Sequence, residues 1–367
     1  MKSPFVGWML SIILLTPFAA TNGLPSNSSI IVDTAPNSVR PYVLPKYKGD
    51  AIKLTSSQTI RFSITANSSD GAFSLLQHNG KASGWLSARP HTHGGQKNAT
   101  NSSHEARVST PGDYGNIPPG SIHTFQLVDP DSQLTHVFHP GGFEKLFKVF
   151  SQGDHDTHGI SAPYVPIPDD PSPFGPMTPR EYNLLEEYIP RRDFMNGTAG
   201  EGKQSWHDGP NTPPDDSMTP YFVAKDYGPK YLNTDIGYKV IQPLATPTQT
   251  EGNFTMGTII MSSKLTNESV STATLPHHFA LQMEEGQLAF QVQGYELVHL
   301  LHGDVAFVPA GVSFSYYATV PYTKFMYMNA GSKGLDYQLL RRSVSWDFPA
   351  YPISPGFKAN ITGSKFT

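Results

Sequence analysis

Three histidines in the first half of the chain have the type and spacing of a metal site. His91 and His93 stand two residues apart, and His123 follows them further along the chain. On a β-strand, residues i and i+2 project from the same face, so the first two imidazoles point together. His123 faces the same interior if its strand begins after Gly120. Three convergent imidazoles suit copper, iron, nickel, manganese or zinc, and we predict a metal site on them; structural histidines are the alternative.

A weak internal repeat places His123 within the fold. Residues 112–125 align without a gap on residues 303–316, and both read Gly-Asp, four residues, Pro-x-Gly and an aromatic-bearing segment. A Gly-Asp turn, a strand and a Pro-x-Gly turn build the corner of a small barrel. Chance agreement of a short motif is the alternative to duplication. Where the first copy has His123, the second has Phe314, so we expect no metal in the second copy.

Two strand-rich segments must position these residues. Residues 59–64 in the first and 287–293 in the second alternate with a period near two, which is typical of half-buried antiparallel strands. We assign residues 28–152 to an N-terminal barrel and residues 219–350 to a C-terminal barrel. The fold class is therefore predicted as all-β, with two barrels of the jelly-roll type.

A connector, residues 153–218, joins the two barrels and is rich in proline and aspartate. One short helix is predicted inside it: Thr178 can cap, Pro179 suits the first helical position, and Glu181 completes a capping box ahead of Leu184. We expect the connector to pack onto the barrels and not to form a third domain.

The N-terminus predicts export. Residues 1–23 have the charge, apolar run and small residues of a secretory signal peptide, and no later apolar run reaches the roughly 20 residues that span a bilayer. We therefore expect a soluble, secreted, extracellular glycoprotein without a membrane partner. N-glycosylation sequons agree with this expectation and lie at Asn27, Asn67, Asn98, Asn101, Asn196, Asn253, Asn267 and Asn360.

Composition excludes several classes of protein. The chain has no cysteine, so stability comes from packed cores without disulfides. A net charge of -4 with scattered basic residues is unlike a nucleic-acid-binding surface. No Gly-x-Ser-x-Gly elbow, Walker loop or dinucleotide fingerprint is present, which argues against serine hydrolase and nucleotide chemistry.

The histidine spacing resembles the signature motifs of the cupins, and residues 29–345 are similar to the fungal quercetin 2,3-dioxygenases, which are secreted bicupins. The Asp-Pro-Asp segment and the run Tyr227-Gly-Pro-Lys-Tyr-Leu-Asn233 have no part in generic cupin motifs and favour this family. The remaining matches are Ala35-Pro-x-x-Val-Arg-Pro-Tyr42, His91-x-His93, Pro111-Gly-Asp-Tyr-Gly115, His123-Thr-Phe-Gln126, Pro140-Gly-Gly-Phe-Glu144, Gly303-Asp-Val-Ala-Phe307 and Gly334-Leu-Asp336.

The resemblance implies one divalent metal, copper in the fungal members, held by three histidines and a glutamate in the first barrel. His91, His93 and His123 match the three histidine positions. It also implies a flavonol and dioxygen as partners, with the heterocycle opened and carbon monoxide released, in a monomer or homodimer. Phe125 would stack on the flat substrate, with Leu76 and Leu134 beside it; a core role is the alternative for Phe125.

The chain departs from the family at the glutamate. About a strand's length that would carry it is absent after His93, and Asn98 stands where the carboxylate is expected. Either the sequence lacks a piece, or this is a variant in which Glu105, His104 or water fills the position. Ile60, His78, Leu76 and Leu134 also replace family pocket residues. A catalytically impaired bicupin that binds a small aromatic metabolite is therefore the alternative function.

Overall fold

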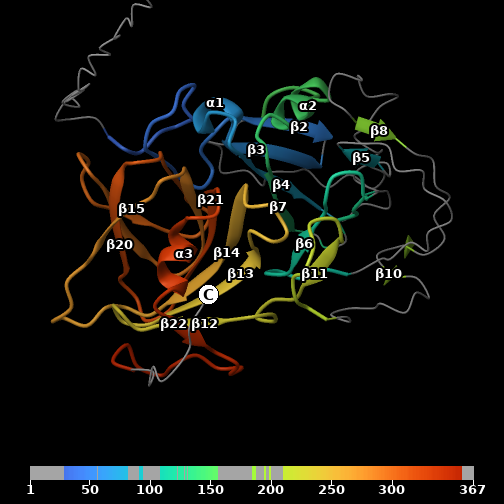
Figure 1. Ribbon diagram of the computed structural model, residues 1–367. Helices are drawn as coiled ribbons and strands as arrows, with labels where there is room; N and C mark the ends of the chain where they lie inside the picture. Colours follow the sequence, from blue (N-terminus) through green and yellow to red (C-terminus); the bar gives the residue numbers. More distant parts are fainter. Residues whose placement is uncertain are drawn as a thin grey trace, which may run out of the picture.

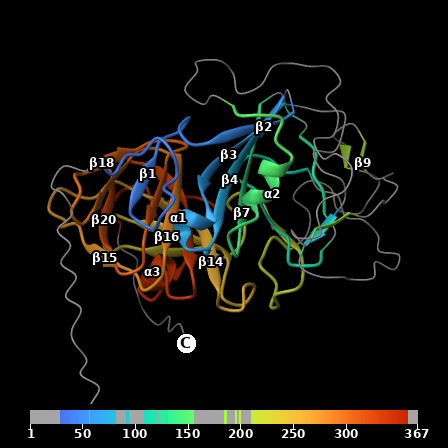
Figure 2. The same ribbon diagram turned by 90° about the horizontal axis from the view of Figure 1, so that it is seen from above.

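The structure is a computed structural model that describes residues 29–357, apart from residues 56, 82–90, 94–107, 122, 128, 130, 156–183, 187–193, 196–197 and 200–209. Only the backbone is described for four short strands: β5 (His91–His93), β8 (Leu184–Glu186), β9 (Phe194–Met195) and β10 (Thr198–Ala199). Figures 1 and 2 show two β-structures next to one another, the blue-green N-terminal one and the orange C-terminal one.

The C-terminal barrel consists of two antiparallel sheets. The larger sheet has eight strands in the order β1-β19-β16-β21-β14-β13-β12-β22, and the smaller has the order β15-β20-β17-β18. Aromatic side chains fill the space between the sheets, and Phe314 stacks on Phe279 with ring centroids 5.1 Å apart. The strands are β12 (Tyr231–Asn233), β13 (Lys239–Ala245), β14 (Phe254–Met261), β15 (Thr272–Thr274), β16 (Phe279–Glu285), β17 (Leu288–Val292), β18 (Val298–Leu300), β19 (Val305–Val308), β20 (Ser313–Ala318), β21 (Thr323–Ala330) and β22 (Ser343–Ser345), and helix α3 is Leu335–Leu340.

The N-terminal barrel contains the sheet β2-β3-β4-β7, formed by Ala51–Thr55, Gln58–Ile64, Ser74–Gly80 and Ser132–Phe138. Helices α1 (Ala66–Ser69) and α2 (Glu144–Val149) lie at one end of this sheet. The buried Glu144 carboxylate joins the helices to the sheet, because it accepts hydrogen bonds from the Ala66 backbone N–H (2.8 Å) and from Ser74 Oγ (2.5 Å). Apolar side chains of the sheet, with Phe147 of α2, form a core on one face.

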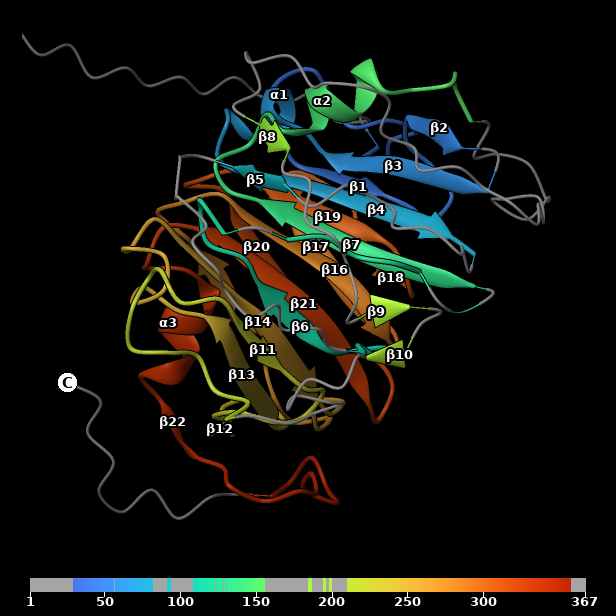
Figure 3. The ribbon, with the colours of Figure 1, turned by 90° about the vertical axis from the view of Figure 1, so that its right-hand side faces the viewer.

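Each barrel takes one strand from the other half of the chain. Strand β1 (Tyr42–Leu44) pairs antiparallel with β19 of the C-terminal barrel. Strand β11 (Tyr221–Val223) pairs antiparallel with β6 (Tyr114–Asn116), and Figure 3 shows these two strands side by side. The registers are equivalent, since Tyr42 lies opposite Phe307 and Tyr221 lies opposite Asn116, in each case three residues after the aspartate of a Gly-Asp turn. The internal repeat predicted from the sequence is therefore present in the structure.

The two Gly-Asp turns hold the exchanged strands with equivalent hydrogen bonds. Asp304 Oδ1 accepts the backbone N–H of Lys46, just after β1, and Asp113 Oδ1 accepts that of Lys225, just after β11; both distances are 2.8 Å. The second carboxylate oxygen of each aspartate accepts a backbone N–H three residues earlier in its own turn. Gly303 has a φ of +86°, and a Cβ there would approach the Lys46 side chain to 2.7 Å, so glycine is required.

A second contact between the halves is polar and buried. Gln77 on β4 donates to Gln282 on β16 (2.8 Å), and Gln282 donates in turn to Thr135 on β7 (3.3 Å). Arg61 on β3 donates to Gln77 and, at 2.6 Å, to the Pro45 carbonyl after β1. An apolar cluster that includes side chains of β4 and β14 surrounds this network. The two barrels thus share one continuous interface.

The predicted helix of the connector is wrong where it can be checked. Residues 184–186 form strand β8 and not a helix, while residues 178–183 lie outside the described part of the chain. The capping pattern is local, whereas pairing of β8 with β5 is a long-range interaction that overrides it.

The sequon residues Asn67, Asn253 and Asn267 are exposed, and the other five lie outside the described residues, as do residues 1–23. No helix in the described residues is long and apolar enough to cross a membrane.

We predict that Asp304→Ala lowers the free energy of unfolding by about 2–3 kcal/mol, because two backbone N–H groups lose a charged acceptor. Asp304→Asn keeps one acceptor oxygen and should lose about half as much. Urea unfolding followed by fluorescence measures the difference, with the exposed Asp50→Ala as the matched control. An unfolding midpoint of Asp304→Ala equal to that of the control would show that the turn does not hold β1.

Asp336 gives a prediction about pH. Its carboxylate accepts a hydrogen bond from Asn329 (3.1 Å), and burial raises its pKa to about 6. Since the unfolded chain has a pKa near 3.9, the stability that this group contributes is fully present below about pH 4 and is lost as the pH rises through about 6. The wild type should therefore lose about 2–3 kcal/mol relative to Asp336→Asn between pH 4 and 7. Denaturant unfolding at both pH values tests this, and parallel profiles contradict it.

Candidate metal and substrate site

His123 is the one predicted metal ligand whose side chain the structure describes. Its Nδ1 lies 3.0 Å from the backbone carbonyl of Ser121. A carbonyl oxygen only accepts hydrogen bonds, so Nδ1 carries the proton and the lone pair of the neutral ring is on Nε2. Metal-binding histidines commonly have this arrangement, in which the other ring nitrogen donates to a carbonyl. The tautomer of His123 therefore fits a metal ligand.

His91 and His93 form strand β5, whose side chains lie outside the described residues. The backbone pairs antiparallel with β8 of the connector, and His91 lies opposite Glu186 while His93 lies opposite Leu184. Residues directly opposite one another in an antiparallel pair share a face, so both histidines and Glu186 belong to one face of this pair. Sequence reasoning missed Glu186, since long-range pairing of the connector has no local signal.

The predicted substrate-binding residues lie around the β4–β7 pair. Leu76 lies opposite His136, and His78 lies opposite Leu134, so these four residues share one face of the sheet. Leu76 is fully buried in the apolar core of the first barrel, whereas Leu134 is 36% exposed. Phe125 joins them from the segment after His123, with its ring centroid 5.5 Å from that of His78.

His136 is a site residue that the sequence analysis did not single out, and its ring is buried among the other rings of the first barrel. Its ring lies 5.9 Å from that of His78 and 5.7 Å from that of Phe125. His139 lies beyond the end of β7 and stacks on Phe254. His136 lies diagonally across from His78 on the neighbouring strand, a relation that only the register of β7 with β4 reveals.

His78 and His136 are neutral and only partly satisfied. Burial, with a smaller contribution from the neighbouring His136 imidazole, lowers the pKa of His78 to about 3. Burial, with a smaller contribution from the His123 imidazole, lowers the pKa of His136 to about 4. His78 Nδ1 and His136 Nε2 are buried and have no hydrogen-bond partner among the described residues. A buried polar atom left in this state costs about 1–3 kcal/mol, and such atoms are rare in native structures. The interior of the first barrel is thus an aromatic site with two unsatisfied ring nitrogens.

The interior of the second barrel is different. Phe314 occupies the position equivalent to His123 and packs between Phe279 and Phe290. His278 accepts a backbone N–H from Ala310 at 3.0 Å, and Glu284 forms an ion pair with Lys324. Nowhere in the described part of the chain do three His, Cys, Asp or Glu side chains gather closely enough to hold a metal ion.

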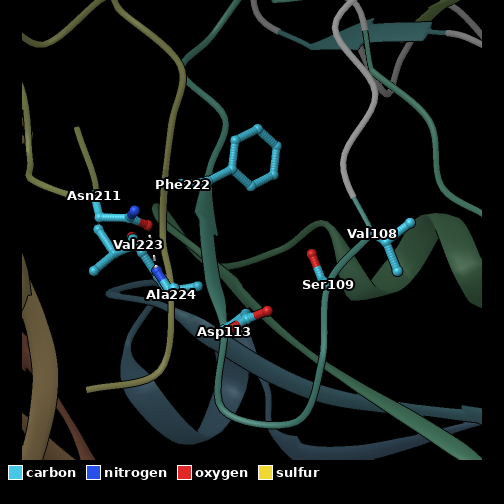
Figure 4. Close-up of a pocket in the computed structure, with 8 residues that line it drawn as sticks. Val108, Ser109, Asp113, Asn211, Phe222, Val223 and Ala224 are labelled. Atoms are coloured by element: carbon cyan, nitrogen blue, oxygen red, sulfur yellow. Dashed lines mark hydrogen bonds between the residues drawn. The ribbon is translucent and has the colours of Figure 1, made fainter. Parts of the chain in front are cut away.

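Two hollows lie elsewhere. The one in Figure 4 is beside the Asp113 turn, where Ala224 donates to Asn211, and its volume of about 10 Å³ is room for a single water molecule. The other has about 480 Å³ and is a surface hollow formed by residues 351–357. Neither is lined by Phe125 or by the imidazoles, so neither is the candidate site.

Comparison with known proteins decides the family. No family model matches, but the chain is 36% identical over 350 residues to quercetin 2,3-dioxygenase of Aspergillus japonicus, which covers 89% of this chain and 99% of that protein. The chain belongs to the quercetin 2,3-dioxygenase family. As a member of this family it has the predicted bicupin fold, and the fold class is confirmed.

Parts of the chain are also similar to solved structures. An ethanolamine utilization protein from Salmonella typhimurium matches 26% of this chain and 71% of its own at 22% identity, with a TM-score of 0.22. An RmlC-like cupin from Shewanella frigidimarina matches 29% of this chain and 86% of its own at 16% identity, with a TM-score of 0.24.

Proposed function

We propose that this chain is a secreted, metal-dependent dioxygenase that opens the heterocycle of quercetin or a related flavonol with release of carbon monoxide. The observation that carries the proposal is the 36% identity to the Aspergillus enzyme over almost its whole length. Further support comes from the tautomer of His123 and from the aromatic site around Phe125. The exposed sequon asparagines are compatible with secretion.

His91, His93 and His123 would hold the metal, with copper as the first choice and iron, nickel or manganese as alternatives. When bound, the ion would act as a Lewis acid toward the 3-hydroxyl of the flavonol and as an electron conduit to dioxygen. Phe125 would stack on the flat ring system, and Leu76 and Leu134 would exclude water beside it. Both atoms of dioxygen enter the products, so the reaction needs no further oxidant.

Glu186 is our candidate for the missing carboxylate. The family segment that carries this glutamate is absent after His93, and β8 of the connector pairs with β5 at this point. Glu186 occupies the register position opposite His91, on the face shared by His91 and His93. There it would complete the donor set and take the proton of the substrate hydroxyl, which is the work of a positioned base.

We expect purified protein to bind one divalent metal ion per chain and to bleach quercetin aerobically with release of carbon monoxide. His123→Ala should weaken metal binding by more than about 100-fold, because even the outer partners of metal ligands are worth about 10–100-fold. The exposed His299→Ala in the second barrel is the matched control. One bound metal with unchanged quercetin absorbance would favour the alternative, a bicupin that binds an aromatic molecule without opening it.

Glu186→Gln should weaken metal binding at least about tenfold and lower the rate of quercetin cleavage, since it removes the charge at constant size. Glu187→Gln, one position along, is the matched control and should behave as the wild type. Metal content and metal dissociation constants, measured by elemental analysis and competition with a chelator, give a readout apart from turnover. Equal metal affinity of the two variants would remove Glu186 from the donor set.

A further inference from the structure

The unsatisfied nitrogen of His78 is an acceptor with a defined direction. His78 Nε2 lies 3.0 Å from Gln58 Oε1, and an amide oxygen only accepts, so Nε2 carries the proton. The other nitrogen, Nδ1, therefore has the lone pair, and it is the buried atom without a partner among the described residues. A hydrogen-bond donor is the group that this atom requires.

The neighbours of His78 indicate the chemical class of that donor. The Phe125 ring is edge-on to His78, with an interplanar angle of 85°, and the His136 ring lies on the other strand of the pair. Next to them, Leu134 lies opposite His78 in the register and is partly exposed. A flat, apolar ring that carries a hydroxyl fits this combination of aromatic walls and one buried acceptor.

We propose that His78 is a specificity-determining residue whose Nδ1 accepts a hydrogen bond from a phenolic hydroxyl of the substrate, other than the hydroxyl that binds the metal. This inference rests on the proposed function, since it assigns a phenolic ligand to the same barrel. His136 Nε2, the second buried atom without a described partner, lies on the same face and forms the second polar contact of the ligand. A deoxygenated analogue leaves both nitrogens unpaired and binds more weakly.

Two substitutions of His78 separate recognition from structure. In His78→Asn the amide oxygen takes the position of Nδ1, so the acceptor remains, but the hydrogen bond to Gln58 is lost. In His78→Gln the amide nitrogen takes the position of Nε2, so the bond to Gln58 remains, but the acceptor is lost. The two variants should therefore have opposite effects on selectivity and on stability.

The experiment measures anaerobic binding of quercetin and of 3-hydroxyflavone, which keeps only the hydroxyl that meets the metal. We expect the wild type and His78→Asn to prefer quercetin by about tenfold or more. His78→Gln should bind both flavonols within about twofold of each other, while urea unfolding shows it to be more stable than His78→Asn.

Each other outcome overturns a specific claim. Full quercetin preference in His78→Gln would remove the recognition role of His78. Loss of preference in both variants, in parallel with their stability, would make the residue structural. Equal binding of both flavonols by the wild type would refute the inference and leave the dioxygenase proposal standing. Binding of neither flavonol by the wild type would refute both.

Discussion

The hydrogen bonds of two aspartate side chains to the exchanged strands are the interaction on which this structure depends. Asp113 and Asp304 each close their own turn and hold the backbone just beyond a strand that comes from the other half of the chain. Strand β1 extends the eight-stranded sheet at its edge, β11 forms a two-stranded sheet with β6, and the two registers are equivalent. The face of β4 that contains Gln77 packs against the second barrel. The opposite face, which contains His78, lies inside the first barrel.

The two halves use this common frame for different purposes. In the second barrel, Phe314 and its aromatic neighbours fill the interior, so burial of apolar surface is its main contribution. In the first barrel, inward positions of β4 and β7 carry His78 and His136, and burying a ring nitrogen without a partner among the described residues is costly. The second barrel contributes mainly apolar packing. The first barrel contains the buried ring nitrogens of His78 and His136 that have no partner among the described residues. This division explains how one duplicated fold can support a site in only one of its copies.

Much of the architecture could be predicted because its signals are local. The alternating strands and the repeated Gly-Asp turn are visible in the sequence, whereas the structural roles of the Glu144 and Asp336 carboxylates come from the structure alone. Strand exchange was not predicted, since nothing in the sequence around Tyr42 and Tyr221 indicates which strand each segment pairs with. The same limitation applies to β8: the Thr178 capping pattern indicates a helix, while pairing with β5 decides for a strand.

For the candidate site the sequence supplies residues whose roles stay predictions. The tautomer of His123 is compatible with a metal ligand, and the Phe125 ring lies edge-on to that of His78. His91 and His93 remain predictions, since their side chains lie outside the described residues. His136 was not predicted, because its direction depends on the register of β7 with β4, which alternation within one strand cannot determine.

The exchange of strands also has a consequence for whether the two halves of the chain can exist separately. If either half were made alone, its sheet would end in a row of unpaired backbone groups at β19 or β6, where the other half normally adds a strand. Such an open edge recruits any chain with a suitable strand, and the nearest supply is another copy. Separating the two halves at the connector should therefore yield intertwined oligomers or aggregates, so each half needs the other to close its sheet.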